Sequence, residues 1–125
     1  MFIVHALANG QNSHGAVRIS SVTQFIKDSR FGAVYRYPFQ QSVRNQIAGF
    51  ALQAARDSLA FDWQFDLDTP ERVYCTELVL QAVNAAVDST YLSPHLMKRG
   101  RQYITVDDTY LRPAPLRQVA WFSLH

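Results

Sequence analysis

The chain has 125 residues, of which 48% are hydrophobic and 18% are charged, and its formal net charge is +2 at pH 7. This length and composition predict a single soluble globular domain and exclude a disordered chain. The small charge, with Lys and Arg scattered along the sequence, argues against a nucleic-acid partner. No apolar run approaches the roughly 20 residues of a transmembrane helix. The single cysteine, Cys75, excludes an internal disulfide and a cysteine-based zinc site within one chain.

The N-terminal residues predict a β-hairpin. Phe2 to Leu7 form a short apolar strand, a turn rich in Asn and Gly covers 8–15, and residues 16–20 alternate in polarity. Because the first strand begins at once, we expect either that a preceding segment is missing, which would make the domain N-terminally truncated, or that the strand lies at a sheet edge. Exposed edges tend to pair with another copy, so we expect a homodimer through this strand.

Two helices and a strand are predicted next. Ser20 or Ser21 can cap a short helix that ends near Ser29, and a strand over 31–37 follows it. The clearest helix covers Ser42 to Leu59, because five apolar residues fall on one stripe at helical spacing. These are Val43, Ile47, Phe50, Ala51 and Ala54.

The second half predicts a further helix between irregular segments. Phe61 to Asp68 is an extended aromatic and acidic segment, and the apolar pattern after Cys75 predicts a helix to about Val87. One short helical turn over 92–99, a strand over 103–106, a loop over 107–115 and a final strand over 117–122 complete the prediction. This alternation of long helices and short strands indicates the α+β class.

Cys75 is the first candidate for chemistry. It is predicted where an extended segment gives way to a helix, and the unpaired N–H groups and positive dipole end of a helix N-terminus favour a thiolate. The alternative is a small apolar residue buried in the core, which is where free cysteine usually lies. A nucleophilic cysteine also needs a base, normally histidine.

Of the four histidines, His5 is the best candidate to act with Cys75, because a strand holds an imidazole more rigidly than a loop. The alternative is a strand histidine that faces solvent or is satisfied by the backbone. His14 lies in a turn, His95 follows Pro94 in a loop and His125 ends the chain. No two histidines have the spacing of metal ligands on a helix.

The acidic segment before Cys75 is the third candidate. Asp66 and Asp68 would lie on one face of a strand, but the residues that a calcium loop needs after them are missing. We therefore interpret Asp62, Asp66 and Asp68 as solvated carboxylates, and the aromatic residues between them as core or groove lining. No metal or other cofactor is expected.

The cysteine box resembles a known family. Tyr74-Cys-Thr-Glu-Leu-Val is similar to the Tyr-Cys-Ser-Glu-Leu-Val motif of the circularly permuted papain-like hydrolases of the YiiX/YaeF type, within the NlpC and lecithin retinol acyltransferase-like superfamily. Phe61-Asp-Trp-Gln-Phe-Asp resembles the run that precedes the cysteine there. Loose similarity covers nearly the whole chain, from the first strand to Ile104-Thr-Val-Asp-Asp.

The resemblance implies an α+β fold of the permuted papain-like, NlpC type, with an antiparallel sheet or partial barrel and two or three packed helices. It also implies Cys75 as the nucleophile. The family's base is a histidine in a Ser-His-x-Gly strand upstream of the first strand, and this sequence has no such motif there. Ser13-His14-Gly15 echoes the motif but falls in a turn after that strand. His5 stands where relatives place the residue that orients the base.

The implied function is a thiol-dependent hydrolase or acyltransferase that acts on amide or ester bonds of a peptide, cell-wall or lipid substrate. Three accounts of the missing base are open: a truncated enzyme, His5 as the base, or a domain that has lost catalysis. In the last case the domain is inactive and binds a peptide, a lipid or a partner protein. A short distance between His5 and Cys75 would favour the second account.

Overall fold

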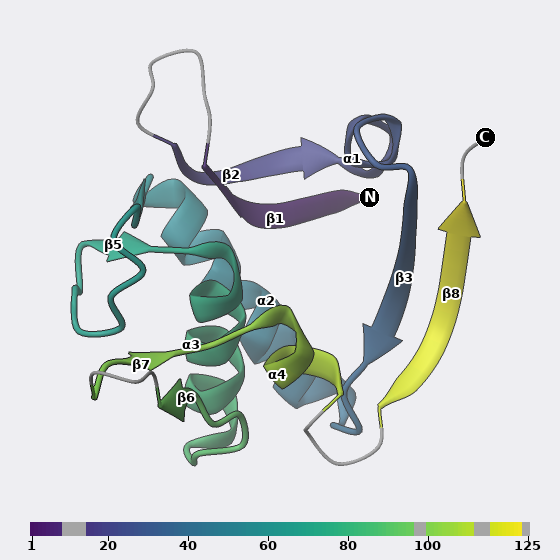
Figure 1. The fold of residues 1–125 in the computed structure, drawn as a ribbon. Coiled ribbons are helices and arrows are strands. Elements are labelled where there is room, and N and C mark those ends of the chain that lie inside the picture. The colour runs from purple at the N-terminus through teal and green to yellow at the C-terminus, as the bar shows by residue number, and fades with distance from the viewer. Residues whose placement is uncertain (9–14, 97–99, 112–115, 124–125) are drawn as a thin grey trace.

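The computed structural model describes residues 1–8, 15–96, 100–111 and 116–123. They form a mixed α+β fold with four helices (Figure 1). The helices are α1 (Val22–Lys27), α2 (Gln41–Arg56), α3 (Cys75–Val87) and α4 (Val106–Tyr110). The strands are β1 (Phe2–Leu7), β2 (Ala16–Ser21), β3 (Phe31–Arg36), β4 (Ala60–Phe61), β5 (Arg72–Val73), β6 (His95–Leu96), β7 (Gln102–Tyr103) and β8 (Arg117–Ser123). The predicted α+β class is confirmed.

The N-terminal half follows the predicted elements closely. β1 and β2 pair antiparallel as the predicted hairpin, with Phe2 opposite Ser21 and Leu7 opposite Ala16. The Ser21 hydroxyl caps α1 by accepting from the Gln24 N–H at 3.1 Å. The sheet continues from β2 to β4 and β5, where β4 and β5 run parallel. Within the described residues the outer edge of β1 has no partner strand.

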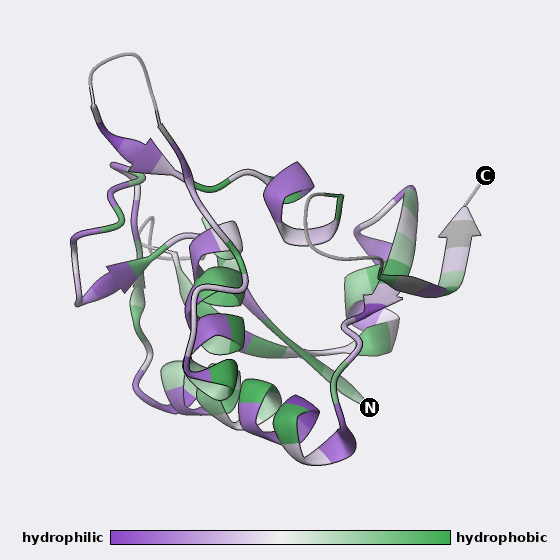
Figure 2. Cartoon of the chain, turned by 90° about the horizontal axis from the view of Figure 1, so that it is seen from below, coloured by the Kyte–Doolittle hydropathy of each residue, from purple (hydrophilic) through white to green (hydrophobic). Residues whose placement is uncertain are grey.

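Helices α2 and α3 pack along each other beneath this sheet. Seen from below, the helices carry hydrophobic patches turn after turn, separated by hydrophilic ones (Figure 2). This pattern is expected of helices that bury one stripe and expose the other. Within the described residues no helix is long and apolar enough to cross a membrane.

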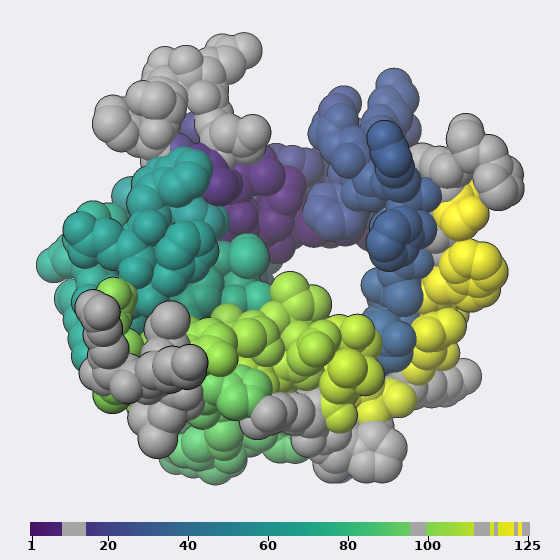
Figure 3. Space-filling view, viewed as in Figure 1, coloured from purple at the N-terminus to yellow at the C-terminus, as the bar shows by residue number. Residues whose placement is uncertain are grey.

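A separate two-stranded ribbon stands beside the helices. It pairs β3 with β8 antiparallel, from Phe31 opposite Ser123 to Arg36 opposite Arg117, and its register shifts between Val34 and Tyr35. α4 lies between this ribbon and α3 (Figure 1). The space-filling view shows an opening bounded by the ribbon, α4 and the N-terminal elements (Figure 3). The sheets thus curl around a hollow without closing over it.

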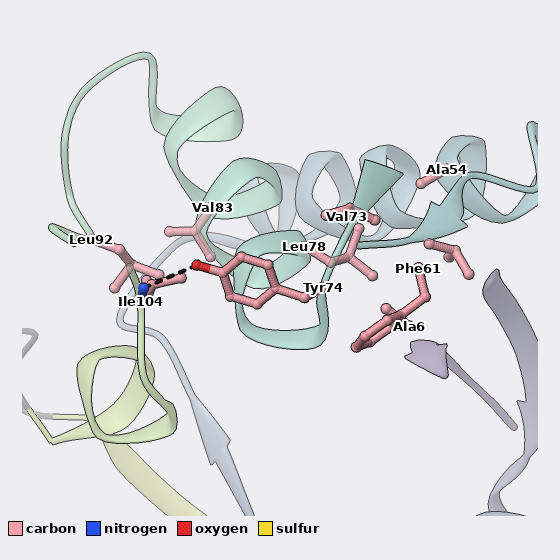
Figure 4. Packing of buried hydrophobic residues seen from close by; sticks show 10 residues of the cluster. Ala6, Ala54, Phe61, Val73, Tyr74, Leu78, Val83, Leu92 and Ile104 are labelled. Carbon is pink, nitrogen blue, oxygen red and sulfur yellow. Dashed lines mark hydrogen bonds between the residues drawn. The ribbon is translucent and has the colours of Figure 1, made fainter. Parts of the chain in front are cut away.

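The core joins the sheet to α3. Tyr74, Leu78 and Val83 pack with residues of β1, β4 and β5 on one side and with Leu92 and Ile104 on the other (Figure 4). Tyr74 is 2% exposed, and its hydroxyl accepts from the Ile104 N–H at 3.1 Å. One aromatic side chain therefore ties the start of α3 to the segment that leads into α4.

Two predicted segments have a different structure. Phe61 to Asp68 is not extended beyond β4, because the buried Asp62 carboxylate accepts from the N–H groups of Gln64 and Asp66 at 2.9 and 2.8 Å and folds the segment into turns. The predicted placement of Asp66 and Asp68 on one strand face is therefore wrong. Phe65 adopts a φ of 53° in these turns.

The C-terminal third holds a helix that was predicted as loop. α4 begins after Thr105, whose hydroxyl accepts from the Asp108 N–H at 3.2 Å while the Asp108 carboxylate accepts from the Thr105 N–H at 2.9 Å. This reciprocal capping box stabilises a helix of only five residues. In place of the helical turn predicted over 92–99, β6 pairs with β7, although part of that range lies outside the described residues.

Candidate active site

Cys75 is the first residue of α3 and is exposed. β5 ends at Val73, and Tyr74 stays extended with φ −98° and ψ 172° before the helix begins. The predicted strand-to-helix junction is therefore confirmed, and the alternative of a buried core cysteine does not fit the exposed side chain. The thiol lies beside N–H groups of a first helical turn, which favour developing negative charge.

The two neighbours of Cys75 fix its position. The Tyr74 hydroxyl accepts from the Ile104 N–H, and the Thr76 hydroxyl donates to the Ile104 carbonyl at 2.8 Å. Both neighbours are buried, with Tyr74 at 2% and Thr76 at 9% exposure. Because the backbone N–H and C=O of one residue, Ile104, hold both side chains, the backbone at Cys75 has little freedom to move.

Two buried carboxylates lie behind the start of α3. Glu77 Oε1 accepts from the Tyr74 N–H at 3.1 Å, and the side chains of Glu77 and Asp62 have no solvent exposure. Burial raises the pKa of Glu77 to about 7, and the charges of Asp62 and Asp66 add to the rise, although the Tyr74 N–H opposes it. The Glu77 carboxyl, two residues after Cys75 in the sequence, therefore becomes negatively charged near neutral pH.

The raised pKa of Glu77 predicts a stability that falls as the pH rises. The folded state holds the Glu77 proton up to about pH 7, whereas the unfolded chain releases it near 4.5, so unfolding becomes easier through this window. In Glu77→Gln, which keeps an acceptor for the Tyr74 N–H, this loss should disappear, with a difference on the order of 2 kcal/mol between pH 5 and pH 8. Urea unfolding at both pH values measures it, with Glu71→Gln as the exposed control. Parallel pH profiles for wild type and Glu77→Gln would contradict the assignment.

The side chain of His5 lies on the face of β1 that points away from the core. Its Nε2 is 2.8 Å from the Ser20 hydroxyl, and its ring meets Phe25 edge-on at 5.6 Å. Burial lowers the pKa of His5 below the ordinary value, which favours the neutral ring. Ala6, the next residue, packs into the core with Tyr74, and successive side chains of a strand point to opposite faces. Among the described residues, His5 and Cys75 share no hydrogen bond or ring contact.

The structure forms a histidine–carboxylate pair that the sequence did not reveal. His95 Nδ1 lies 2.6 Å from Oδ2 of Asp108, whose side chain is fully buried, and the His95 ring stacks on Tyr103 at 5.6 Å. An ionised carboxylate can only accept, so Nδ1 carries the proton and Nε2 of the neutral ring is left to accept one. This is the arrangement of an oriented general base.

The histidine–carboxylate pair connects to the segment around Cys75 through hydrogen bonds. Oδ2 of Asp108 also accepts from the N–H of Thr105, the residue after Ile104, which holds Tyr74 and Thr76 on either side of Cys75. The Thr-x-x-Asp spacing from Thr105 to Asp108 is a capping signal that could have been found in the sequence. The pairing with His95 depends on the β6–β7 register and had no sequence signal.

The other candidates from the sequence form no site with Cys75 in the part of the chain that the structure describes. His14 and His125 lie outside the described residues. The Asp66 carboxylate accepts from the Asp68 N–H at 2.9 Å, which is turn chemistry. In the part of the chain that the structure describes, no group of three His, Cys, Asp or Glu side chains could hold a metal ion.

No protein-family model and no curated protein matches the sequence. One solved structure is similar in fold. It is the crystal structure of the metalloprotein YiiX from Escherichia coli O157:H7, with a TM-score of 0.70 and 14% sequence identity over 88% of this chain and 77% of that one. The fold is similar to that of YiiX. At this identity the likeness establishes the papain-like fold and not an activity, and the described residues offer no cluster that would fit a metal.

Proposed function

We propose that this protein is a thiol-dependent hydrolase or acyltransferase that acts on amide or ester bonds through Cys75. The observation that carries the proposal is the exposed thiol at the first position of α3, in a fold similar to that of YiiX. Its neighbours are held by the backbone N–H and C=O of Ile104, so the thiol is held in place before any substrate arrives. Such preorganisation favours nucleophilic attack.

In the proposed reaction a histidine base takes the proton of the Cys75 thiol, and the sulfur attacks the carbonyl carbon and forms a tetrahedral intermediate. N–H groups of the first turn of α3 stabilise its oxyanion. Collapse of the intermediate breaks the ester or amide bond, the histidine returns the thiol proton to the leaving alcohol or amine, and an acyl thioester stays on Cys75. Water then releases the acid, or an amine or alcohol takes the acyl group.

Two histidines, His5 and His95, are candidates for the base. His5 is the candidate that the sequence favours, and burial favours its neutral form, but Ser20 already occupies its Nε2. His95 has the better support, because Asp108 fixes its Nδ1 and leaves Nε2 as the acceptor. Thr105 and Ile104 join the His95 pair to the residues that flank Cys75.

The test is acyl-enzyme formation from p-nitrophenyl esters, followed by the p-nitrophenolate burst and by intact mass. Wild type should gain one acyl group, and Cys75→Ala should gain none. Loss of the true base should slow the burst by about 10²–10⁴-fold, so His95→Ala and His5→Ala separate the two candidates. Ser20→Ala, which frees His5, is the control.

Acylation of wild type and Cys75→Ala at equal rates would overturn the catalytic proposal. The second candidate function, an inactive papain-like domain that binds a peptide, lipid or partner, would then stand. The hollow beside α4 favours this alternative. The homodimer through the edge of β1 also stays a prediction, and light scattering would contradict it by showing a monomer at all concentrations.

A further inference from the structure

An aromatic groove lies between the β3–β8 ribbon and α4, at the opening seen in Figure 3. Its volume is about 710 Å³, within the range of small-molecule binding sites. Residues from β3, α4, β8 and the segments next to them line it. They are Phe31, Gly32, Ala33, Tyr35, Tyr37, Val106, Thr109, Tyr110, Leu116, Gln118 and Trp121.

One face of the ribbon forms the floor of the aromatic groove. Ala33 pairs with Trp121 across the strands and Tyr35 pairs with Gln118, so the side chains that line the groove sit on matched positions. Phe31 is 78% exposed and Trp121 is 68% exposed. A two-stranded ribbon is marginally stable by itself, and leaving large aromatic side chains in water forgoes the free energy of their burial. An apolar molecule in the groove would cover this surface.

The described lining offers no ionic partner to a charged ligand group. None of the described residues that line the groove carries a charged side chain. Burial, together with the nearby Tyr91, raises the pKa of Tyr37 to about 12, so this wall stays neutral. A charged group placed here would lose its hydration without gaining an ionic partner.

Two tyrosine hydroxyls of the groove are already hydrogen-bonded within its walls. The Tyr37 hydroxyl donates to the Thr109 carbonyl at 2.6 Å, and the Tyr35 hydroxyl donates to the Gln118 side-chain oxygen at 3.0 Å. A peptide would bring one N–H and one C=O per residue and leave most of them unmatched at these walls. An acyl chain has no such groups, so the lining favours it over a peptide.

The groove is long enough for an extended chain. The lining residues from Phe31 to Tyr37 run along β3 and one residue beyond its end, over about 20 Å at the rise of a strand. α4 forms the opposite wall, and the residues just before α4 hold the neighbours of Cys75. We propose that the aromatic groove binds a long, uncharged acyl chain and that this chain is the acyl part of the ester or amide on which Cys75 acts. The second half of this proposal rests on the proposed function.

The experiment measures binding of neutral N-alkyl dansylamides, from butyl to hexadecyl, by energy transfer from tryptophan. Trp121 lines the groove, whereas Trp63 lies in the turns after β4, so Trp121→Phe should abolish the transfer and Trp63→Phe should keep most of it. Affinity should rise up to about fourfold per added methylene until the groove is full. A proline-rich peptide that carries no alkyl chain serves as the competitor and tests whether the groove binds peptides instead.

A matched pair of charge variants locates the site. Ala33→Asp places a carboxylate in the groove, whereas Val34→Asp places it on the next residue of β3, which does not line the groove. Ala33→Asp should weaken binding at least tenfold, and Val34→Asp should change it less than twofold. Equal effects, affinity independent of chain length, or displacement by the peptide would overturn the proposal. So would a dimer that only Ala33→Asp dissociates, since a second copy would then occupy the groove.

Binding is separable from catalysis. Cys75→Ala should bind the hexadecyl probe as wild type does, because Cys75 does not line the groove. In acylation, p-nitrophenyl palmitate should lose at least tenfold in kcat/KM with Ala33→Asp while p-nitrophenyl acetate is unaffected. Chain binding without acylation of Cys75 would overturn the proposed function and leave the binding site standing.

Discussion

Replacing Gly15 with alanine should destabilise the protein by about 3 kcal/mol, because a Cβ has no room there. The added atom would collide with the Leu7 carbonyl and would lie 2.8 Å from both the Ala8 carbonyl oxygen and Phe61 Cβ. Gly15 also has a φ of +26°, a conformation that residues with a side chain rarely adopt. Its carbonyl accepts from the Phe61 N–H at 3.0 Å, so a shift at Gly15 would also strain β4.

The matched control is Gly49→Ala on α2. A Cβ at Gly49 meets nothing within 4 Å, so the same substitution should stabilise the protein by about 0.5–1 kcal/mol through helix propensity. Urea unfolding of both variants measures the difference. If Gly15→Ala were as stable as wild type, the close approach of β1, β2 and β4 at this glycine would be wrong.

The structure follows those sequence predictions that rest on a local or periodic signal. The apolar stripe of α2 extends over several turns, and Ser21 is a recognisable cap, so the structure follows both predictions. α4 has five residues, too few for a helical period, and its capping box was its only local signal. Asp62 looked like a solvated carboxylate, but its burial and its bonds to the following N–H groups are tertiary facts.

The candidate site was half predictable for the same reason. The Cys75 junction follows from a change in local pattern at Tyr74, and the structure confirms it. A partner for the thiol depends on which strands pair and in which register. His95 lies opposite Tyr103 through β6 and β7, two strands of two residues each, and strands so short leave no alternating pattern to read.

Replacing Asp108 with alanine should destabilise the protein by about 3 kcal/mol, because the Asp108 carboxylate satisfies two groups at once. It accepts from the Thr105 N–H at 2.9 Å, a cap worth about 1 kcal/mol, and from His95 at 2.6 Å, a charged hydrogen bond worth about 2 kcal/mol. If His95 is the base, Asp108→Ala should also slow the acylation burst beyond any loss of folded protein. Asp107→Ala is the matched control, because it removes an exposed carboxylate from the same helical turn.

The pH dependence separates the ionic role of Asp108 from its packing. Burial alone would raise the pKa of Asp108, but the hydrogen bonds from Thr105 and His95 outweigh burial and lower it. A carboxyl group with a lowered pKa contributes stability that is complete above its unfolded value and is lost as the pH falls through its folded value. The difference in unfolding free energy between wild type and Asp108→Ala should therefore narrow below about pH 4. A constant difference down to pH 2 would mean that Asp108 contributes through packing, and His95 would then lack the ionised partner that a base requires.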